Sequence, residues 1–122
     1  LEKPEDIMRI FKKAVTDSEA CVRFAPQEKP GVSNLMQIYA VCTGKGIAEI
    51  EREFDGRGYG DFKMAVGEAV VETLRPIREE TERILADKAY LEGVYRAGAE
   101  HASYVANKTL RKVYKKVGFV ER

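Results

Sequence analysis

Residues 55–62 read DGRGYGDF, and this glycine-rich stretch decides between two kinds of fold. Glycine-rich loops hold phosphates where they join a strand to a helix and direct backbone N–H groups at the anion. Here the flanking residues 47–54 and the residues after Tyr59 both carry apolar side chains at helical spacing. GRGYG lacks the spacing of the dinucleotide fingerprint, and no Lys-Ser or Lys-Thr pair follows as in a P-loop. We therefore interpret the loop as a tight reversal between two helices, with Tyr59 and Phe62 anchoring the second helix in the core.

The same helical periodicity extends through the rest of the chain. Apolar residues three and four positions apart predict helices over residues 4–15, 32–42, 47–54, 59–86 and 88–117. Pro76 is expected to bend or break the fourth helix, because proline removes a backbone hydrogen bond. Asp87 suits the start of the last helix and Gly118 suits its end. The sequence predicts an all-α fold, a single domain over residues 1–122, arranged as a bundle of about five helices with a long Pro-kinked helix and a long C-terminal helix.

The last predicted helix has a stripe of apolar and small residues. Its members are Leu91, Val94, Gly98, Ala102, Val105, Thr109 and Val113. We expect the stripe to face a neighbouring helix, because the small Gly98 and Ala102 permit a close approach. His101, the only histidine, lies near the stripe and is expected to be a partly buried structural residue.

Composition excludes several classes of protein. Charged residues make up 34% of the chain and hydrophobic residues 44%, as in soluble globular domains. No apolar run approaches the roughly 18–20 residues that a membrane span needs, and charges interrupt the first ten residues where a signal peptide would be apolar. Cys21 and Cys42 lack the spacing of metal ligands and are expected to be free thiols in a reducing cytoplasm, with a disulfide as the open alternative.

No catalytic residues and no metal site are predicted. The single histidine cannot form a zinc site, because one thiol and no second histidine are too few further ligands. The carboxylates are dispersed over charged helix faces, and none stands in an apolar stretch that would raise its pKa. A Cys–His nucleophile pair stays open as an alternative, because its geometry does not follow from the sequence.

The basic residues concentrate at the C-terminal end. The net charge is only +1, but residues 101–122 carry 6 basic and 1 acidic residue. Such a patch attracts phosphates at moderate salt. Lysines near a helix C-terminus also complement the helix dipole, so a solvated helix end is the alternative. From the residues alone we favour a helical binding module over an enzyme.

Five stretches, in this order, resemble the C-terminal region of bacterial-type tryptophanyl-tRNA synthetases. They are AVTDSE (14–19), EKPGVSNLMQIYAVCTGK (28–45), FDGRGYGDFK (54–63), LRPIREE (74–80) and GAEHASYVANKTL (98–110). The resemblance spans about residues 5–119, and its most specific part combines KPGVSNL with GRGYGDFK. Phe24, Ala25 and Pro26 depart from the family, in which a tyrosine and an aspartate often stand there.

The resemblance implies a longer parent protein. Synthetases of this class carry HIGH-type and KMSKS-type motifs on an N-terminal Rossmann catalytic domain, and neither string occurs here. Because the chain starts at Leu1, we expect an excised part that is inactive alone and holds no cofactor. The parent is expected to be a cytoplasmic homodimer that uses ATP and Mg to attach tryptophan to its tRNA.

The resemblance also implies that this region meets the tRNA anticodon. The predicted phosphate contacts are Lys108, Arg111, Lys112, Lys115 and Lys116. Tyr104 and Tyr114 are predicted to stack on anticodon bases, because single-stranded RNA is usually read by stacking and by hydrogen bonds to base edges. Ordinary packing is the alternative for both tyrosines. The alternative function is an independent helical module that binds a protein partner or acts as a scaffold.

Overall fold

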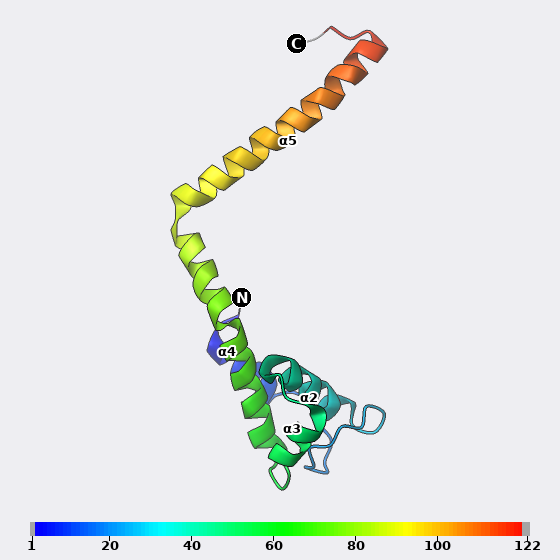
Figure 1. Cartoon of the computed structure of the whole chain (residues 1–122), viewed down its shortest axis with the longest axis vertical. Helices are drawn as coiled ribbons and strands as arrows, with labels where there is room; N and C mark the ends of the chain where they lie inside the picture. The colour runs from blue at the N-terminus through cyan, green and yellow to red at the C-terminus, as the bar shows by residue number, and fades with distance from the viewer. Residues whose placement is uncertain (1, 121–122) are drawn as a thin grey trace. The chain divides into compact units, whose positions relative to one another are not determined.

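The computed structural model describes residues 2–120 and contains five α-helices in this part of the chain (Figure 1). They are α1 (Pro4–Lys12), α2 (Pro30–Thr43), α3 (Ile47–Glu53), α4 (Tyr59–Ala86) and α5 (Lys88–Val117). No strand occurs among the described residues, so the predicted all-α fold is confirmed. The chain divides into two compact units, Leu1–Arg78 and Glu79–Arg122, which are described separately below. The single domain over residues 1–122 stays a prediction.

The first unit has the hydrophobic core. In Figure 1, α2, α3 and the first turns of α4 lie together, and the core forms where they meet. Its completely buried side chains are Val32, Met36, Ile50, Phe54, Phe62 and Val66. The rings of Phe54 and Phe62 pack edge to face with centroids 5.0 Å apart, and Tyr39 packs edge to face on Phe54 at 5.6 Å. Tyr59 is also buried, which confirms Tyr59 and Phe62 as the anchors of α4.

The glycine-rich stretch is a helix-to-helix connection, as predicted. Gly56 has φ 71°, a left-handed conformation that disfavours residues with a side chain. The N–H of Arg57 donates to the carbonyl of Phe54 at 3.0 Å, which closes the turn after α3. The carbonyl of Gly58 accepts the N–H of Phe62 at 3.3 Å and begins α4. These bonds reverse the chain between the two helices without a strand on either side.

Two helix boundaries differ from the prediction by two or more residues. Helix α1 ends at Lys12 rather than at residue 15. Beyond it, the carbonyl oxygen of Val15 lies only 2.3 Å from the position that a Cβ on Gly31 would take, so the backbones touch there. Helix α2 begins at Pro30, two residues before the predicted start. Proline fits the first turn of a helix, because its missing N–H would have no helical partner there.

The long helices begin and end where the sequence indicated. Helix α4 is continuous across Pro76, so the proline does not break it.

On the exposed surface of α4, Arg75 pairs with Glu72 at 2.8 Å and Arg83 pairs with Glu80 at 2.7 Å. The Arg partners lower the pKa of both Glu72 and Glu80.

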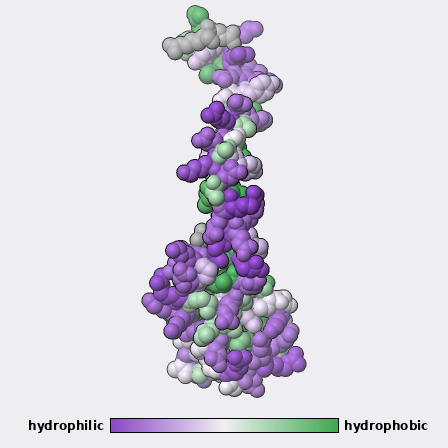
Figure 2. Space-filling view, turned by 90° about the vertical axis from the view of Figure 1, so that its left-hand side faces the viewer, coloured by the Kyte–Doolittle hydropathy of each residue, from purple (hydrophilic) through white to green (hydrophobic). Residues whose placement is uncertain are grey.

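Two packing expectations for α5 were wrong. None of the residues of α5 is buried, and the predicted inward stripe is exposed except for the half-buried Leu91. Figure 2 shows hydrophobic side chains at the surface of this helix among hydrophilic ones. His101 is exposed for the same reason and is not a partly buried structural histidine. Helical spacing predicts which residues share a face, but it does not supply the neighbour that would cover that face.

Candidate nucleic-acid interface

Helix α5 is fixed at both ends by local hydrogen bonds. At its start, Oδ1 of Asp87 accepts the N–H of Tyr90 at 2.9 Å, which confirms the predicted cap. At its end, Gly118 adopts φ 75° and its N–H donates to the carbonyl of Tyr114. The N–H of Phe119 also donates to this carbonyl, at 3.0 Å. The chain therefore turns back immediately after the helix, as helices often do at a left-handed glycine.

The predicted phosphate contacts form one surface, which we call the basic face. It comprises Lys108, Arg111, Lys112, Lys115 and Lys116, all of them exposed on α5. Lys108, Arg111 and Lys115 follow one another at intervals of three and four residues, so they share one side of the helix. Lys112 and Lys116 continue this side on its flank. From Lys108 to Lys116 the surface extends along roughly 12 Å of helix axis.

Acidic residues are scarce in the sequence around the basic face. Residues 101–120 contain no aspartate and no glutamate. This segment therefore has a surplus of basic residues, which attracts polyanions. Lys115 and Lys116 in the last turn also complement the negative end of the helix dipole. That local role does not extend to Lys108, which lies more than two turns before the end.

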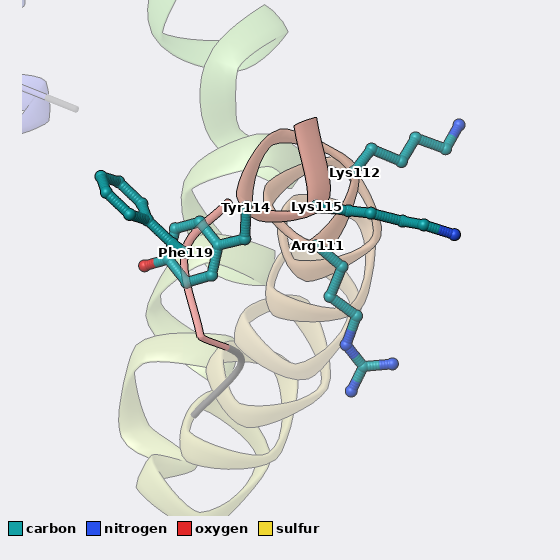
Figure 3. A pocket seen from close by; sticks show the side chains of 5 residues that line it. All are labelled: Arg111, Lys112, Tyr114, Lys115 and Phe119. Atoms are coloured by element: carbon teal, nitrogen blue, oxygen red, sulfur yellow. The ribbon is translucent and has the colours of Figure 1, made fainter. Parts of the chain in front are cut away.

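The two predicted stacking tyrosines lie in different surroundings. Tyr104 is 70% exposed and stands four residues before Lys108, on the side of the helix that carries the basic face. Tyr114 is half-buried and packs edge to face against Phe119, with ring centroids 5.8 Å apart. Figure 3 shows this aromatic pair on one side of the helix end, while Arg111 and the two neighbouring lysines project on the other. The geometry favours Tyr104 over Tyr114 as a stacking residue, and both roles stay predictions.

The sequence reading missed Phe119. A hydrophobic residue directly after a helix-ending glycine commonly packs back on the last turn. That signal was present in the residues Gly118 and Phe119 and identifies the partner of Tyr114. An open hollow at this end is lined by Arg111, Lys112, Tyr114, Lys115 and Phe119. Because its lining side chains diverge (Figure 3), it is a surface feature and not an enclosed small-molecule site.

The described residues contain no group of three or more histidine, cysteine, aspartate or glutamate side chains placed to hold a metal ion. Cys21 is exposed, Cys42 is half-buried, and neither forms a disulfide in the structure. Among residues 2–120 we also find no helix with the length and apolarity required to cross a membrane.

Known proteins resemble this chain over almost its whole length. The family model for class I tRNA synthetases (W and Y) matches residues 1–75. The tryptophan–tRNA ligase of Clostridium tetani is 48% identical over 98% of this chain and 35% of its own length. That of Oceanobacillus iheyensis is 47% identical over 97% of this chain and 36% of its own length.

A solved structure agrees with these sequence matches. The crystal structure of tryptophanyl-tRNA synthetase from Mycoplasma pneumoniae matches 98% of this chain and 36% of its own, with a TM-score of 0.64 and 26% sequence identity. The chain thus spans about a third of the length of the relatives that it matches. The resemblance to tryptophanyl-tRNA synthetases inferred from the five motifs is confirmed. On the family match and these relatives, the chain belongs to the class I tRNA synthetases of the W and Y group.

Proposed function

We propose that this chain is the C-terminal anticodon-binding domain of a tryptophan–tRNA ligase and that the basic face of α5 contacts the tRNA. The observation that carries the proposal is the alignment of five exposed cations on one surface of a single helix, in a segment where basic residues outnumber acidic ones. A surface of this kind fits a polyanion that runs along the helix axis. Because these relatives are named tryptophan–tRNA ligases, we infer that this polyanion is the tRNA for tryptophan.

In this proposal the basic face positions the tRNA, and other groups read it. Lys and Arg contacts to phosphates supply affinity that is independent of sequence and set the register of the complex. Anticodon bases are unstacked and accessible, so an exposed aromatic ring can stack on one of them. Tyr104 is the ring that stands beside the cations and is exposed for this contact.

The chemical steps belong to the whole protein and not to this chain. The proposed parent uses ATP and Mg to form tryptophanyl-adenylate and then transfers the tryptophanyl group to the tRNA. It works in the cytoplasm as a homodimer, and an N-terminal catalytic domain holds the ATP and the amino acid. In this proposal the 122-residue chain contributes the tRNA contact, and the catalytic groups lie in the other part of the parent protein.

One observation favours a second function, a helical module that binds a protein partner. Apolar side chains stand exposed along α5, among them Tyr95, Val105 and Val113. Exposed apolar surface is a feature of protein interaction sites. The two functions differ in their response to salt, because phosphate contacts weaken steeply as salt rises and an apolar interface does not.

The test is a binding titration of the chain with tryptophan tRNA and with an anticodon-swapped copy, each at two salt concentrations. The proposal expects tighter binding to the native anticodon and a steep loss of affinity with salt. Equal, salt-sensitive binding to both would leave only a non-specific basic surface. If the chain binds neither RNA but the whole synthetase binds them, recognition needs parts outside this chain. If a synthetase that lacks this region discriminates between the two RNAs as well as the whole synthetase does, the anticodon assignment is wrong.

A further inference from the structure

The connecting segment, residues 13–29, lies between α1 and α2 and has no regular secondary structure. It nevertheless places two side chains inside the first unit. Val22 is only 6% exposed and belongs to the hydrophobic core. Lys29 is only 2% exposed, although lysine is almost never fully buried unless it is paired. Side-chain bonds must therefore hold this segment in place, because helix and strand ladders do not.

The ammonium group of Lys29, itself buried, is the centre of a polar cluster. Its Nζ lies 2.6 Å from Oε2 of Glu19 and 3.1 Å from Oδ1 of Asp17. It also donates to the hydroxyl of Tyr59 at 3.2 Å. We call these four residues, Asp17, Glu19, Lys29 and Tyr59, the Lys29 cluster. All three protons of the ammonium group thus have an acceptor.

Tyr59 connects the cluster to the helical core. Its hydroxyl lies 2.6 Å from Oδ1 of Asp17 and 3.0 Å from the carbonyl oxygen of Cys21, and both are acceptors. Its ring is buried at the start of α4. The hydrogen bond from Tyr59 lowers the pKa of Asp17 to about 2, and the bond to Glu19 raises the pKa of Lys29. The carboxylate and the ammonium group therefore stay charged at neutral pH.

The loop formed by residues 16–21 has few other attachments. Ala20 adopts φ 54°, a left-handed conformation that is strained for a residue with a Cβ. Residues 18–21 are all exposed. The remaining long-range polar contacts of the connecting segment begin later, where the N–H of Phe24 donates to Glu51 at 2.8 Å and that of Ala25 donates to Ser33 at 3.0 Å. A strained, exposed loop persists only if its surroundings hold it.

We propose that the Lys29 cluster holds the loop of residues 16–21 against the start of α4. When the bonds of the cluster are broken, this loop opens locally. The cluster joins both ends of the connecting segment to Tyr59, because Asp17 and Glu19 lie near its beginning and Lys29 at its end. Opening relieves the strain at Ala20 and exposes the partly buried carboxylate of Asp17 to water. The helical core keeps its own apolar contacts, so it stays folded while the loop is open.

Native-state hydrogen exchange on the 122-residue chain tests this proposal. In the variant Lys29→Met, the amide of Glu19, which donates to Asp17 at 2.9 Å, is expected to exchange at least about tenfold faster. Amides within α2 and α4 are expected to change less than about twofold. The matched control is Arg23→Gln, which breaks an exposed ion pair of the same segment, Arg23 with Glu28 at 3.0 Å, and should leave the Glu19 amide unchanged.

A second variant keeps the test decisive if Lys29→Met does not fold. Tyr59→Phe removes only the hydroxyl and leaves the ring in the core, so it should accelerate exchange at Glu19 by several-fold while the helices keep their protection. Equal acceleration at Glu19 and throughout α2 and α4 in both variants would overturn the proposal, because the cluster would then contribute only to global stability. Unchanged exchange at Glu19 in Tyr59→Phe would overturn it as well.

Discussion

The variant Lys108→Gln/Lys115→Gln tests the role of the basic face most directly. The two residues are seven positions apart, so they lie on the same side of α5, two turns from each other. Both are exposed and α5 has no buried residue, so the substitutions disturb no packing. Glutamine also has nearly the same helix propensity as lysine. The variant therefore removes two charges and little else, and its circular dichroism spectrum should match that of the parent chain.

The expected magnitude follows from the number of cations on the basic face. On a single-stranded target, each neutralised phosphate contributes about −0.7 to the slope of log K against log salt concentration. Five contacts give a slope of about −3.5, so affinity falls roughly 100-fold between about 50 mM and about 200 mM salt. With three contacts left, the slope becomes about −2 and the loss over the same range about 20-fold.

The assay is a titration of labelled tryptophan tRNA at several salt concentrations, and the slope is the quantity compared. The charge-matched control is Lys12→Gln/Lys13→Gln, which removes two exposed charges from the end of α1. The control should keep the parent slope, because α1 is outside the proposed contact. If the control flattens the slope as much as the α5 variant, or if the α5 variant keeps the slope of about −3.5, the tRNA does not lie on the basic face.

Three further predictions concern the first unit. Phe62→Ala should lower the free energy of unfolding by about 3–5 kcal/mol in urea denaturation, because the ring is completely buried. Gly31→Ala should lower it by about 1–3 kcal/mol, since its Cβ would meet the carbonyl oxygen of Val15 at 2.3 Å. Its control, Gly60→Ala, meets nothing within 4 Å in α4 and should be neutral or stabilising by up to about 1 kcal/mol. Finally, the pKa of Asp17 is lowered to about 2, so its contribution to stability is present above its unfolded pKa of about 4 and is lost as the pH falls through about 2. Urea midpoints measured across this pH range should show the loss of stability in the parent chain and not in Asp17→Asn. An identical acid dependence in both chains would contradict the assignment of this effect to Asp17.

The helices were predictable wherever a local signal marks their ends. Asp87 and Gly118 fix α5 through hydrogen bonds to residues three and four positions away, so their roles follow from short stretches of sequence. Beyond the end of α1, Val15 approaches Gly31, and no local signal indicates this contact between residues 16 positions apart. The helix α2 was predicted to start at residue 32, but Pro30 fits the first turn of a helix as well as a connection. Local chemistry permits both readings, and the tertiary structure decides between them.

The same division applies to the candidate sites. The basic face was predictable, because helical spacing alone places Lys108, Arg111 and Lys115 on one side. The Lys29 cluster was not, since Asp17 and Tyr59 are 42 residues apart and no spacing rule joins them. The two packing errors on α5 have a related cause. A stripe of apolar residues predicts a face, while the burial of that face depends on a partner that the sequence of the helix does not contain.

The exposure of α5 makes the proposed tRNA contact separable from folding. Substitutions in a core change binding and stability together, and their effects on a ligand are then difficult to assign. No residue of α5 is buried, so a change on the basic face is expected to alter affinity while the free energy of unfolding stays within about 0.5 kcal/mol. The Lys29 cluster provides the converse case, because its residues lie in the first unit and none belongs to the basic face. If Lys29→Met opens the loop of residues 16–21 yet leaves the salt slope of tRNA binding unchanged, the Lys29 cluster and the RNA contact are independent. A change in slope would instead mean that the loop itself contributes to the RNA-binding surface.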